Sequence, residues 1–480
     1  MRAADGTLRV AVAGGGVAGM ATALNLLDRA RDAGVDLQVT VFEAGAEPGG
    51  HLRTIRDDGW QLEWGPNGFL DNEPATLRLV DRLDLRDRLV RSSDLARIRF
   101  LLKDGRLHEL PSSPPAFLKT GLLGVGAKLR VAGELFVPAR RADAAADPAQ
   151  DETIYEFGVR RLGREFAEIF LDPMVKGVFG GDARRISLAA AFPRMVELER
   201  DHGGLFKALA AISKQRKKAA DAGPSGVLHS FQGGMADLID ALAAALRADP
   251  RAELRTGAPV QTIARDGDLW RVDGDGPFHA VIAAAPAHAT APALPDAELA
   301  AEVAAIPYSP MAVITLGFRR QDVGHPLQGF GHLVPSREKK RLLGALWTSS
   351  IFPGRAPAGH VLLRCMAGGP GDPAVLEQDD DALVSIALGE LEELLELKAD
   401  PVRHWVIRHP RAIAQYLPGH MARLRRMDAR LAELPGLLLT GSSYKGISVN
   451  YCAKEAELAA DAALAHLRGA DRPRTLEAHR

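Results

Sequence analysis

The chain has little cysteine: Cys365 and Cys452 are the only two among its 480 residues, and they are far apart in the sequence. A disulfide framework or a cysteine zinc site is therefore not expected, and the low count fits a reducing compartment such as the cytoplasm. The histidines also lack the spacing of metal ligands, so no metal site is predicted. The histidines considered are His108, His229, His332 and His404.

An excess of one charge is absent, and so is a long apolar run. Lys and Arg number 60 against 61 Asp and Glu, a net charge of -1, which argues against a nucleic-acid-binding protein. Met1 to Gly6 lack the basic and then apolar pattern of a signal peptide. No uncharged apolar run reaches the roughly 18 residues of a transmembrane helix, and the Ala-rich run Val281 to Leu294 is interrupted by prolines. We expect a protein that neither spans a membrane nor binds nucleic acid.

A glycine motif follows the first predicted strand. Leu8 to Ala13 is a short apolar run with β-branched residues, which is typical of a buried parallel strand. Gly14, Gly16 and Gly19 then have the GxGxxG spacing, and Val17 to Leu27 continues as an apolar helical pattern. The first glycine permits a tight turn, the second lets backbone approach a pyrophosphate, and the third lets the helix pack on the strand. The helix N-terminus favours phosphate binding.

An acidic residue and a second glycine pair favour FAD among the dinucleotides. Leu37 to Phe42 is a second strand pattern, and Glu43 stands at its end, where a carboxylate can accept both hydroxyls of an adenosine ribose and would repel a 2′-phosphate. Gly49 and Gly50 follow. This arrangement is similar to FAD enzymes of the amine oxidase superfamily, in which such a pair lies along the pyrophosphate and ribityl chain.

Two further turns are predicted to meet the flavin. Asp57 to Glu63 reads as a hairpin with its turn at Asp58-Gly59, and it leads into a rigid loop that suits a flat ring. That loop contains Gly65, Pro66 and Asn67. Near the other end of the chain, the strand pattern Leu437 to Thr440 runs into a second glycine turn, from Gly441 to Gly446, and a helix from about Asn450.

The rest of the chain predicts two more units. Leu107 to Gly223 shifts to Pro-rich and then helical composition, with helices over Ile154 to Leu171 and Leu188 to Ile212 and a loop over Ala142 to Asp151. Strands of one antiparallel sheet are expected at Val313 to Phe318, Leu342 to Trp347 and Val361 to Met366. The predicted fold class is α/β: a Rossmann-type FAD-binding domain, an antiparallel-sheet substrate-binding domain and a helical insertion. The expected limits are 1–58, 226–300 and 411–480 for the FAD-binding domain, 59–106 and 301–410 for the substrate-binding domain, and 107–225 for the helical domain.

The stretch Phe157 to Leu198, with its segments RRLG, DP, KGVFGGD, ISL and AAFP, resembles the middle region of protoporphyrinogen oxidases. The segments GPN, PSSPPAF, FQGGM, GFGHLVPS and GSSYKGISVNYC agree in the same order, so the resemblance covers nearly the whole chain. It implies an FAD-dependent oxidase in haem biosynthesis that uses dioxygen to convert a porphyrinogen to the porphyrin. Protoporphyrinogen IX is the expected substrate, with coproporphyrinogen III as the alternative. A homodimer and contact with the cytoplasmic membrane surface stay open.

The resemblance also assigns site residues. Arg99 matches an arginine that pairs with a propionate, although Arg97 has a similar claim. A guanidinium can hold a carboxylate through two parallel hydrogen bonds. The other implied substrate-binding residues are Gly177, Leu333 and Met366, whose alternative role is plain packing. The FAD site is implied to include Val260, Gly441, Gly446, Ile447 and Ser448.

Some positions depart from the family pattern. Ser442, Ser448, Tyr451 and Gly68 stand where Asn, Gly, Asp and Ser are usual. Two alternatives therefore stay open: a divergent superfamily flavoenzyme with another substrate, or a catalytically silent flavin- or tetrapyrrole-binding protein. An amine oxidase would need an aromatic cage, which five Trp and five Tyr supply poorly. Lys445, beside the predicted flavin turn, could stabilise an anionic flavin, and Cys452 could attach the flavin covalently. We expect neither role, because a loop lysine is usually solvated and the neighbours of Cys452 match the family members that bind FAD non-covalently.

Ala116 to Val137 is the segment that fits a membrane surface. Its Leu, Phe and Val residues occur with Lys119, Lys128 and Arg130, a composition that suits an interfacial helix pair. Leu122 to Val125 is the expected apolar face, and ordinary helical packing is the alternative.

Overall fold

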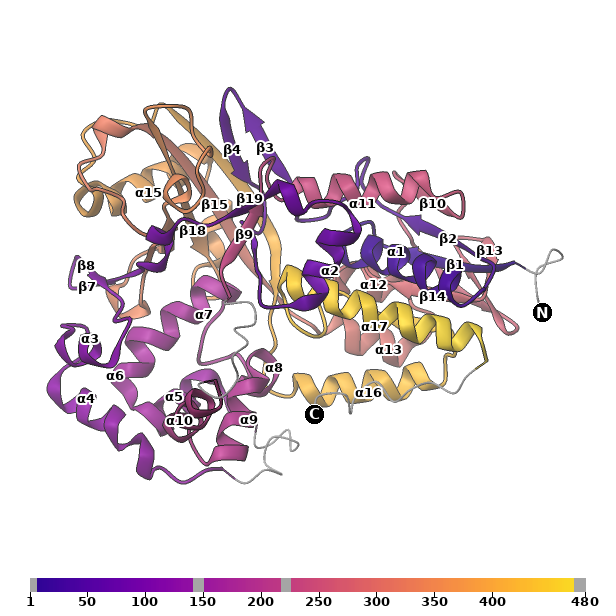
Figure 1. Cartoon of the computed structure of the whole chain (residues 1–480), viewed down its shortest axis with the longest axis horizontal. Helices are drawn as coiled ribbons and strands as arrows, with labels where there is room; N and C mark the ends of the chain where they lie inside the picture. Colours follow the sequence, from indigo (N-terminus) through magenta and orange to yellow (C-terminus); the bar gives the residue numbers. More distant parts are fainter. Residues whose placement is uncertain (1–6, 141–150, 217–225, 470–480) are drawn as a thin grey trace.

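The computed structural model describes residues 7–140, 151–216 and 226–469. Three parts are visible in Figure 1: a layered α/β part, a part built on a large sheet, and a helical part. The α/β part contains a five-stranded sheet of order β10-β2-β1-β14-β20, in which every neighbouring pair is parallel. Numbered by position in the chain, this is the order 3-2-1-4-5 of a Rossmann sheet. The strands are β1 (Leu8–Ala13), β2 (Leu37–Phe42), β10 (Ala252–Arg255), β14 (Ala280–Ala283) and β20 (Leu437–Leu439).

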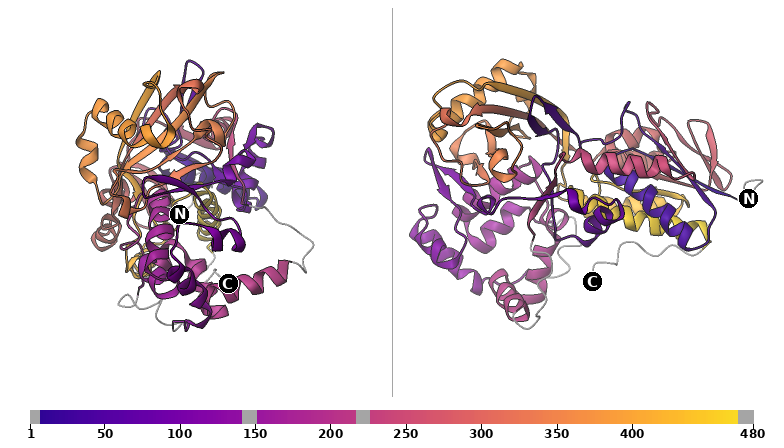
Figure 2. Two further views of the ribbon diagram at one scale, coloured as in Figure 1. Left: turned by 90° about the vertical axis from the view of Figure 1, so that its left-hand side faces the viewer. Right: turned by 45° about the horizontal axis from the view of Figure 1, so that its top comes forward.

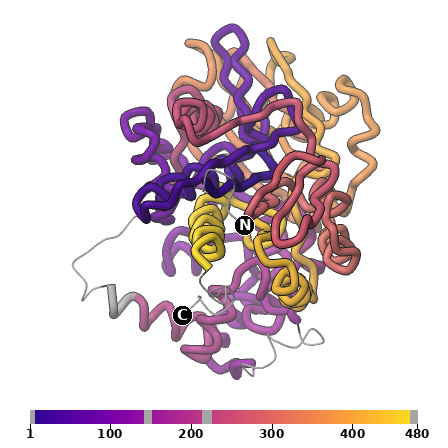
Figure 3. Tube along the Cα trace, turned by 90° about the vertical axis from the view of Figure 1, so that its right-hand side faces the viewer, coloured from indigo at the N-terminus to yellow at the C-terminus, as the bar shows by residue number. Residues whose placement is uncertain are grey.

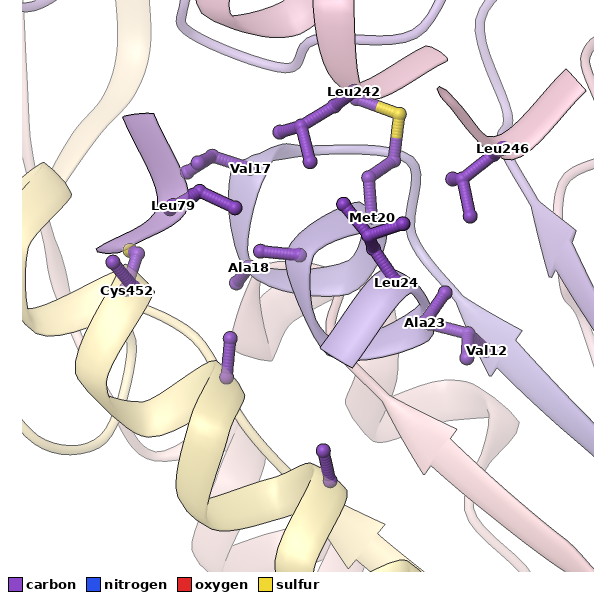
Figure 4. Close-up of a cluster of buried hydrophobic side chains, with 14 of the residues drawn as sticks. Val12, Val17, Ala18, Met20, Ala23, Leu24, Leu79, Leu242, Leu246 and Cys452 are labelled. Atoms are coloured by element: carbon purple, nitrogen blue, oxygen red, sulfur yellow. The ribbon is translucent and has the colours of Figure 1, made fainter. Parts of the chain in front are cut away.

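Helices from distant parts of the chain cover this sheet. They are α1 (Val17–Asp32), α2 (Pro74–Arg82), α11 (Ala236–Ala248) and α17 (Val449–Leu467). Figure 4 shows why α1 is buried almost all round: its side chains meet Leu79 of α2, Leu242 and Leu246 of α11, and Cys452 of α17. Figure 3 shows α17 (yellow) beside the first strand and helix (indigo). The sequence predicts residues 59–106 in the substrate-binding domain, but α2 packs into the core of the α/β part.

The second part is built on a seven-stranded sheet of order β19-β15-β18-β17-β16-β7-β8. It is antiparallel, as predicted, except for the parallel pair β16 and β7. Helix α15 (Asp380–Leu395) packs against one face, and the hairpin β3 (Thr54–Asp57) and β4 (Trp60–Glu63) contributes Trp60 and Leu62 to the other. The strands are β7 (Phe100–Lys103), β8 (Arg106–Glu109), β15 (Tyr308–Arg319), β16 (Gly331–Leu333), β17 (Leu342–Leu346), β18 (His360–Gly368) and β19 (Arg403–Ala414).

The third part is helical and lies against the sheet through α7, which contacts β16 and β17 (Figures 1 and 2). The predicted helix over Ile154 to Leu171 is broken at Gly163, where φ is +96°, and the one over Leu188 to Ile212 is broken at Pro193 and at Gly203. Nearly all of the predicted loop Ala142 to Asp151 lies outside the described residues. Among the residues described, we find no helix that is both long and apolar enough to cross a membrane. The helices are α3 (Pro114–Lys119), α4 (Val125–Ala132), α5 (Ile154–Leu162), α6 (Arg164–Phe166), a π-helical turn (Ala167–Leu171), α7 (Asp172–Phe179), α8 (Leu188–Ala191), α9 (Pro193–His202) and α10 (Leu205–Arg216).

Smaller elements connect these parts. A three-stranded meander of order β11-β12-β13 turns at Gly267 and Asp268, between its first two strands. A short sheet of order β5-β9-β6 links the α/β part to the seven-stranded sheet, and helices α13 and α16 pack against each other. Their bounds are β5 (Phe69–Leu70), β6 (Leu89–Arg91), β9 (Leu228–Phe231), β11 (Ile263–Asp266), β12 (Leu269–Val272), β13 (Asp275–Phe278), α12 (Ala287–Thr290), α13 (Ala297–Ala304), α14 (Thr348–Ile351) and α16 (His420–Ala432).

Candidate active site

The turn between β1 and α1 leaves no room for side chains at two of its glycines. Gly14 has φ +120°, and a Cβ there would lie 2.7 Å from the backbone N of Ala285. A Cβ on Gly19 would lie 1.9 Å from the carbonyl O of Gly14, so only glycine lets the helix pack this closely. Gly16 differs, since a Cβ there would meet no atom within 4 Å. Open space beside a helix N-terminus fits a bound pyrophosphate, and binding by these glycines stays a prediction.

The carboxylate of Glu43 ties the glycine turn to the loop that follows β2. Its Oε2 accepts a hydrogen bond from the backbone N–H of Gly15 at 2.8 Å, and its Oε1 accepts one from Gly45 at 2.7 Å. Each oxygen keeps a lone pair for a ribose hydroxyl. The loop that carries Val260 lies beside this group, because the N–H of Ala258 donates to the Glu43 carbonyl at 2.8 Å. Glu43 and Val260, two of the predicted FAD-binding residues, therefore come from adjacent segments.

The second glycine pair lies against the first. The N–H of Gly49 donates to the carbonyl of Gly15 at 2.8 Å, and Gly49 forms a parallel bridge with Gly16. Gly49 and Gly50 both have positive φ, at +130° and +58°. Because side chains rarely adopt such backbone, these positions favour glycine and keep backbone groups accessible.

The Gly65–Asn67 loop packs on the residue that follows this pair. A Cβ on Gly65 would lie 2.1 Å from the carbonyl O of His51, so backbone contacts backbone. Asn67 is half-buried, and its Oδ1 accepts a hydrogen bond from Nη1 of Arg364 at 2.6 Å. The loop therefore lies between the glycine turns and β18 of the seven-stranded sheet.

The C-terminal glycine turn reaches the same region. Gly441 has φ +104°, and a Cβ there would contact the Ala284 carbonyl at 3.4 Å. The adjoining α17 begins at the N-cap Ser448, whose side chain accepts from a backbone N–H of the first turn. Asn450 in that turn donates to the carbonyl of Leu70, three residues beyond Asn67. The predicted flavin-binding residues of both chain ends, Gly446 and Ile447 included, are thus brought to one side of the α/β part.

Three of the four predicted substrate-binding residues meet. A Cβ on Gly177, in α7, would lie 2.7 Å from Cδ2 of Leu333. Leu333 and Met366 are both registered with Gly344 on β17, so the three positions form one row across neighbouring strands. Residues in register share a face, and a Cβ on Gly344 would lie 3.0 Å from Cδ2 of Leu333, so the Leu333 side chain packs directly over this glycine. An apolar wall of this kind suits a flat macrocycle.

Arg99, the fourth, lies just before β7 with an exposed side chain. Its guanidinium stands 5.2 Å from the ring centre of Phe330, and no described carboxylate pairs with it. The competing Arg97 lies 3.5 Å from Asp94. Arg99 is therefore the better candidate for a ligand carboxylate.

Three rings beside the Gly65–Asn67 loop were not predicted, because their residues come from separate segments. His51, Trp64 and His409 have ring centres 4.3 to 5.7 Å apart and interplanar angles of 51° to 77°. Nε2 of His409 donates to the Trp64 carbonyl at 2.9 Å. Burial lowers the pKa of His409 to about 4, so it is neutral near pH 7. None of these pairs is parallel, so they form no slot for a substrate between two ring faces.

The residues near the C-terminal turn have ordinary surroundings. The Nζ of Lys445 lies 4.0 Å from Oε2 of Glu455, so its charge is paired with a carboxylate of the protein. Cys452 is buried in the nucleotide-binding core, where desolvation raises the pKa of its thiol to about 12. A buried thiol of this kind is inert, which disfavours covalent attachment. Tyr451 packs on Gly446, where a Cβ would lie 2.2 Å from its ring.

Comparisons with known proteins agree with this geometry. Residues 17–464 match the family model for flavin containing amine oxidoreductase. The chain is 26% identical to coproporphyrinogen III oxidase of Bacillus subtilis (strain 168), over 96% of this chain and 99% of that protein. It is 30% identical to a chloroplastic protoporphyrinogen oxidase of Oryza sativa subsp. japonica, over 93% and 86%. A crystal structure of an Exiguobacterium sp. 255-15 protein, provisionally assigned as protoporphyrinogen oxidase, superposes with a TM-score of 0.80 at 26% identity and covers 98% of this chain and 100% of its own. The chain belongs to the flavin containing amine oxidoreductase family, whose cofactor is a flavin.

Proposed function

We propose that the protein is an FAD-dependent oxidase that converts a porphyrinogen, protoporphyrinogen IX or coproporphyrinogen III, to the porphyrin with dioxygen as the electron acceptor. The relatives named above are a coproporphyrinogen III oxidase and a protoporphyrinogen oxidase, and the chain matches 99% and 86% of their lengths. FAD is favoured over other flavins because Glu43 stands where an adenosine ribose would lie, next to the glycine turn.

The observation that carries the substrate class is the row Leu333, Gly344 and Met366 with Gly177 packed above it. An apolar wall formed by Leu333 and Met366 can support a flat tetrapyrrole without hydrogen bonds to it. Arg99, just before β7, supplies a cation for a propionate. Bound FAD would supply the two-electron acceptor chemistry.

Two other functions are less well supported. An amine oxidase would hold its substrate between facing aromatic rings, and the rings of His51, Trp64 and His409 pack edge-on to one another. The second is a silent carrier, a protein that binds flavin or a tetrapyrrole without catalysis, and it would be consistent with the departures from the family pattern at Ser442, Ser448 and Tyr451. However, Ser448 caps α17 and the ring of Tyr451 covers Gly446, so these two changes have structural roles.

The test uses purified protein loaded with FAD. Flavin absorbance and release of free FAD on denaturation report the cofactor, and aerobic formation of fluorescent porphyrin from each porphyrinogen reports the reaction. We expect a yellow protein that accelerates porphyrin formation above the blank. Bound flavin without acceleration on either porphyrinogen would favour the silent carrier, and a colourless protein that takes up no FAD would refute the proposal.

We further propose that the protein acts in the cytoplasm with its helical part on a membrane surface. The expected face was partly wrong, since Leu122 and Leu123 are buried in the core. Other apolar side chains of the same segment are exposed by 44% to 87%, namely Leu118, Val125, Leu129, Leu135 and Phe136. Exposed apolar side chains on one segment are typical of interfacial binding.

Sedimentation with anionic lipid vesicles tests this contact. The double variant Leu129→Ser, Phe136→Ser should lose vesicle binding and keep its thermal stability, since both side chains are exposed. Leu458→Ser, at an exposed leucine of α17, is the matched control and should bind as before. Equal vesicle binding by the unchanged protein, the double variant and the control would contradict the membrane proposal.

A further inference from the structure

Arg364 is a buried arginine in the middle of β18. Only 7% of it is exposed. It lies two residues before Met366, and side chains in a strand alternate between faces, so Arg364 and Met366 share one face of the sheet. The arginine is therefore placed next to the apolar wall described above.

The charge of Arg364 has little compensation. No carboxylate of the described residues lies within ion-pair distance, and its Nε has no hydrogen-bond partner. Glu63 is the nearest acidic group to influence it, but the oxygens of Glu63 accept from Thr54 Oγ1 at 2.8 Å and from the N–H of Met235 at 3.2 Å. Burial lowers the pKa of Arg364 to about 10, which still leaves it charged near pH 7.

Another buried arginine shows how this protein normally compensates such a charge. Arg161 is 1% exposed, and it forms ion pairs with Glu134 and Glu199 as well as hydrogen bonds to backbone carbonyls. A buried cation without such partners is costly. The difference suggests that a bound ligand completes the surroundings of Arg364.

A hydrogen bond connects Arg364 to the Gly65–Asn67 loop. A guanidinium can only donate, so the Oδ1 of Asn67 must face Arg364. The amide Nδ2 then points away from Arg364, and no described group accepts a hydrogen bond from it. Asn67 lies in the loop predicted to meet the flavin ring.

We propose that Arg364 is a positioning residue that orients the amide of Asn67 toward the flavin and makes the flavin a stronger electron acceptor. This inference rests on the proposed function. Hydride transfer from a porphyrinogen carbon adds two electrons and one proton to the flavin, so the flavin gains one negative charge, while a substrate N–H proton leaves to water. A buried positive charge favours that gain. At an effective dielectric constant of about 20, one charge changes such an equilibrium tenfold at distances out to about 12 Å.

The experiment measures the reduction potential of the bound flavin and its affinity for sulfite, an anion that adds to electron-poor flavins. In Arg364→Gln the charge is lost, so sulfite should bind at least tenfold more weakly. The same factor in a two-electron equilibrium lowers the potential by about 30 mV. Arg364→Lys keeps the charge and should restore most of both values. Arg403→Gln, at an exposed arginine of β19 paired with Asp57, is the control and should match the unchanged protein.

A second variant protects the test against a folding defect. Asn67→Asp places a carboxylate against Arg364, so an ion pair replaces the present hydrogen bond and the net positive charge is cancelled without a change in size. We expect the same loss of sulfite affinity and the same fall in potential as in Arg364→Gln.

Two results would overturn the inference. One is an unchanged potential and sulfite affinity in Asn67→Asp and in every folded Arg364 variant. The other is a rise in KM for porphyrinogen with no change in potential, which would assign Arg364 to a substrate carboxylate. Failure of the proposed function is a separate result, because it shows in the unchanged protein as absence of FAD uptake or of porphyrin formation.

Discussion

Two glycines in one turn should respond in opposite ways to the same change. In Gly16→Ala the new methyl group meets no protein atom within 4 Å, and the backbone at this N-cap (φ -79°, ψ 179°) is ordinary for any residue. We expect the thermal stability of the FAD-free protein to stay within about 0.5 kcal/mol, as for surface substitutions. The methyl group would occupy the space in which a phosphate approaches the backbone.

The cost to FAD binding can be estimated from one displaced contact. A hydrogen bond from a backbone N–H to a charged group contributes about 1.5–3 kcal/mol. Its loss in Gly16→Ala corresponds to a roughly 10- to 150-fold weaker Kd for FAD. The assay is flavin fluorescence quenching on FAD-free protein, with the Tm of that protein measured in parallel.

Gly19→Ala provides the contrast. Its Cβ would lie 1.9 Å from the Gly14 carbonyl, so strand and helix must separate. Forcing a methyl group into packed structure costs about 1–3 kcal/mol, which should lower the Tm even without FAD. An unchanged FAD affinity in Gly16→Ala would refute the placement of the pyrophosphate, and an unchanged Tm in Gly19→Ala would refute the packing argument.

Three further outcomes are expected. Arg99→Ala should raise the KM for porphyrinogen and keep flavin content, whereas Arg97→Ala should leave steady-state kinetics unchanged; equal kinetics in both would remove Arg99 from the site. Glu43→Gln should weaken FAD binding, because its amide must face the N–H of a glycine; a titration that gives the original Kd would contradict this. Burial lowers the pKa of His332 to about 4, so the unfolded chain takes up a proton first as the pH falls below 6.5. That protonation costs about 2 kcal/mol of stability between pH 8 and 5, and denaturant unfolding of His332→Leu should show that much less acid sensitivity.

The first two strands of the α/β part could be predicted from local sequence alone. The strand patterns Leu8 to Ala13 and Leu37 to Phe42 match β1 and β2 residue for residue. Both runs are short and apolar. Three glycines, which permit a tight turn, end the first run, and the charged residue Glu43 ends the second. Because those constraints act within a few residues, no knowledge of tertiary contacts was needed.

The longest strand that the sequence did not predict is β19, whose position in the sheet cannot be inferred from its own residues. β19 carries several charged residues and Pro410, a pattern that does not read as a strand. It lies at the edge of the seven-stranded sheet, and its pairing with β15 is irregular between His409 and Ile413. Edge strands tolerate charge and proline because one side of their backbone has no neighbour. Only the strand order reveals that position.

Arg364 shows a different limit. The run His360 to Gly368 is apolar apart from its first residue and this arginine, so a single buried charge was visible as an anomaly. The sequence could not tell which face of the strand it occupies or what lies against it. Its neighbour Asn67 is almost 300 residues away, in a loop fixed by His51 and Gly65. A buried charge without an ionic partner is costly, and the hydrogen bond from this guanidinium to Asn67 connects the seven-stranded sheet to the loop that the sequence predicts to meet the flavin.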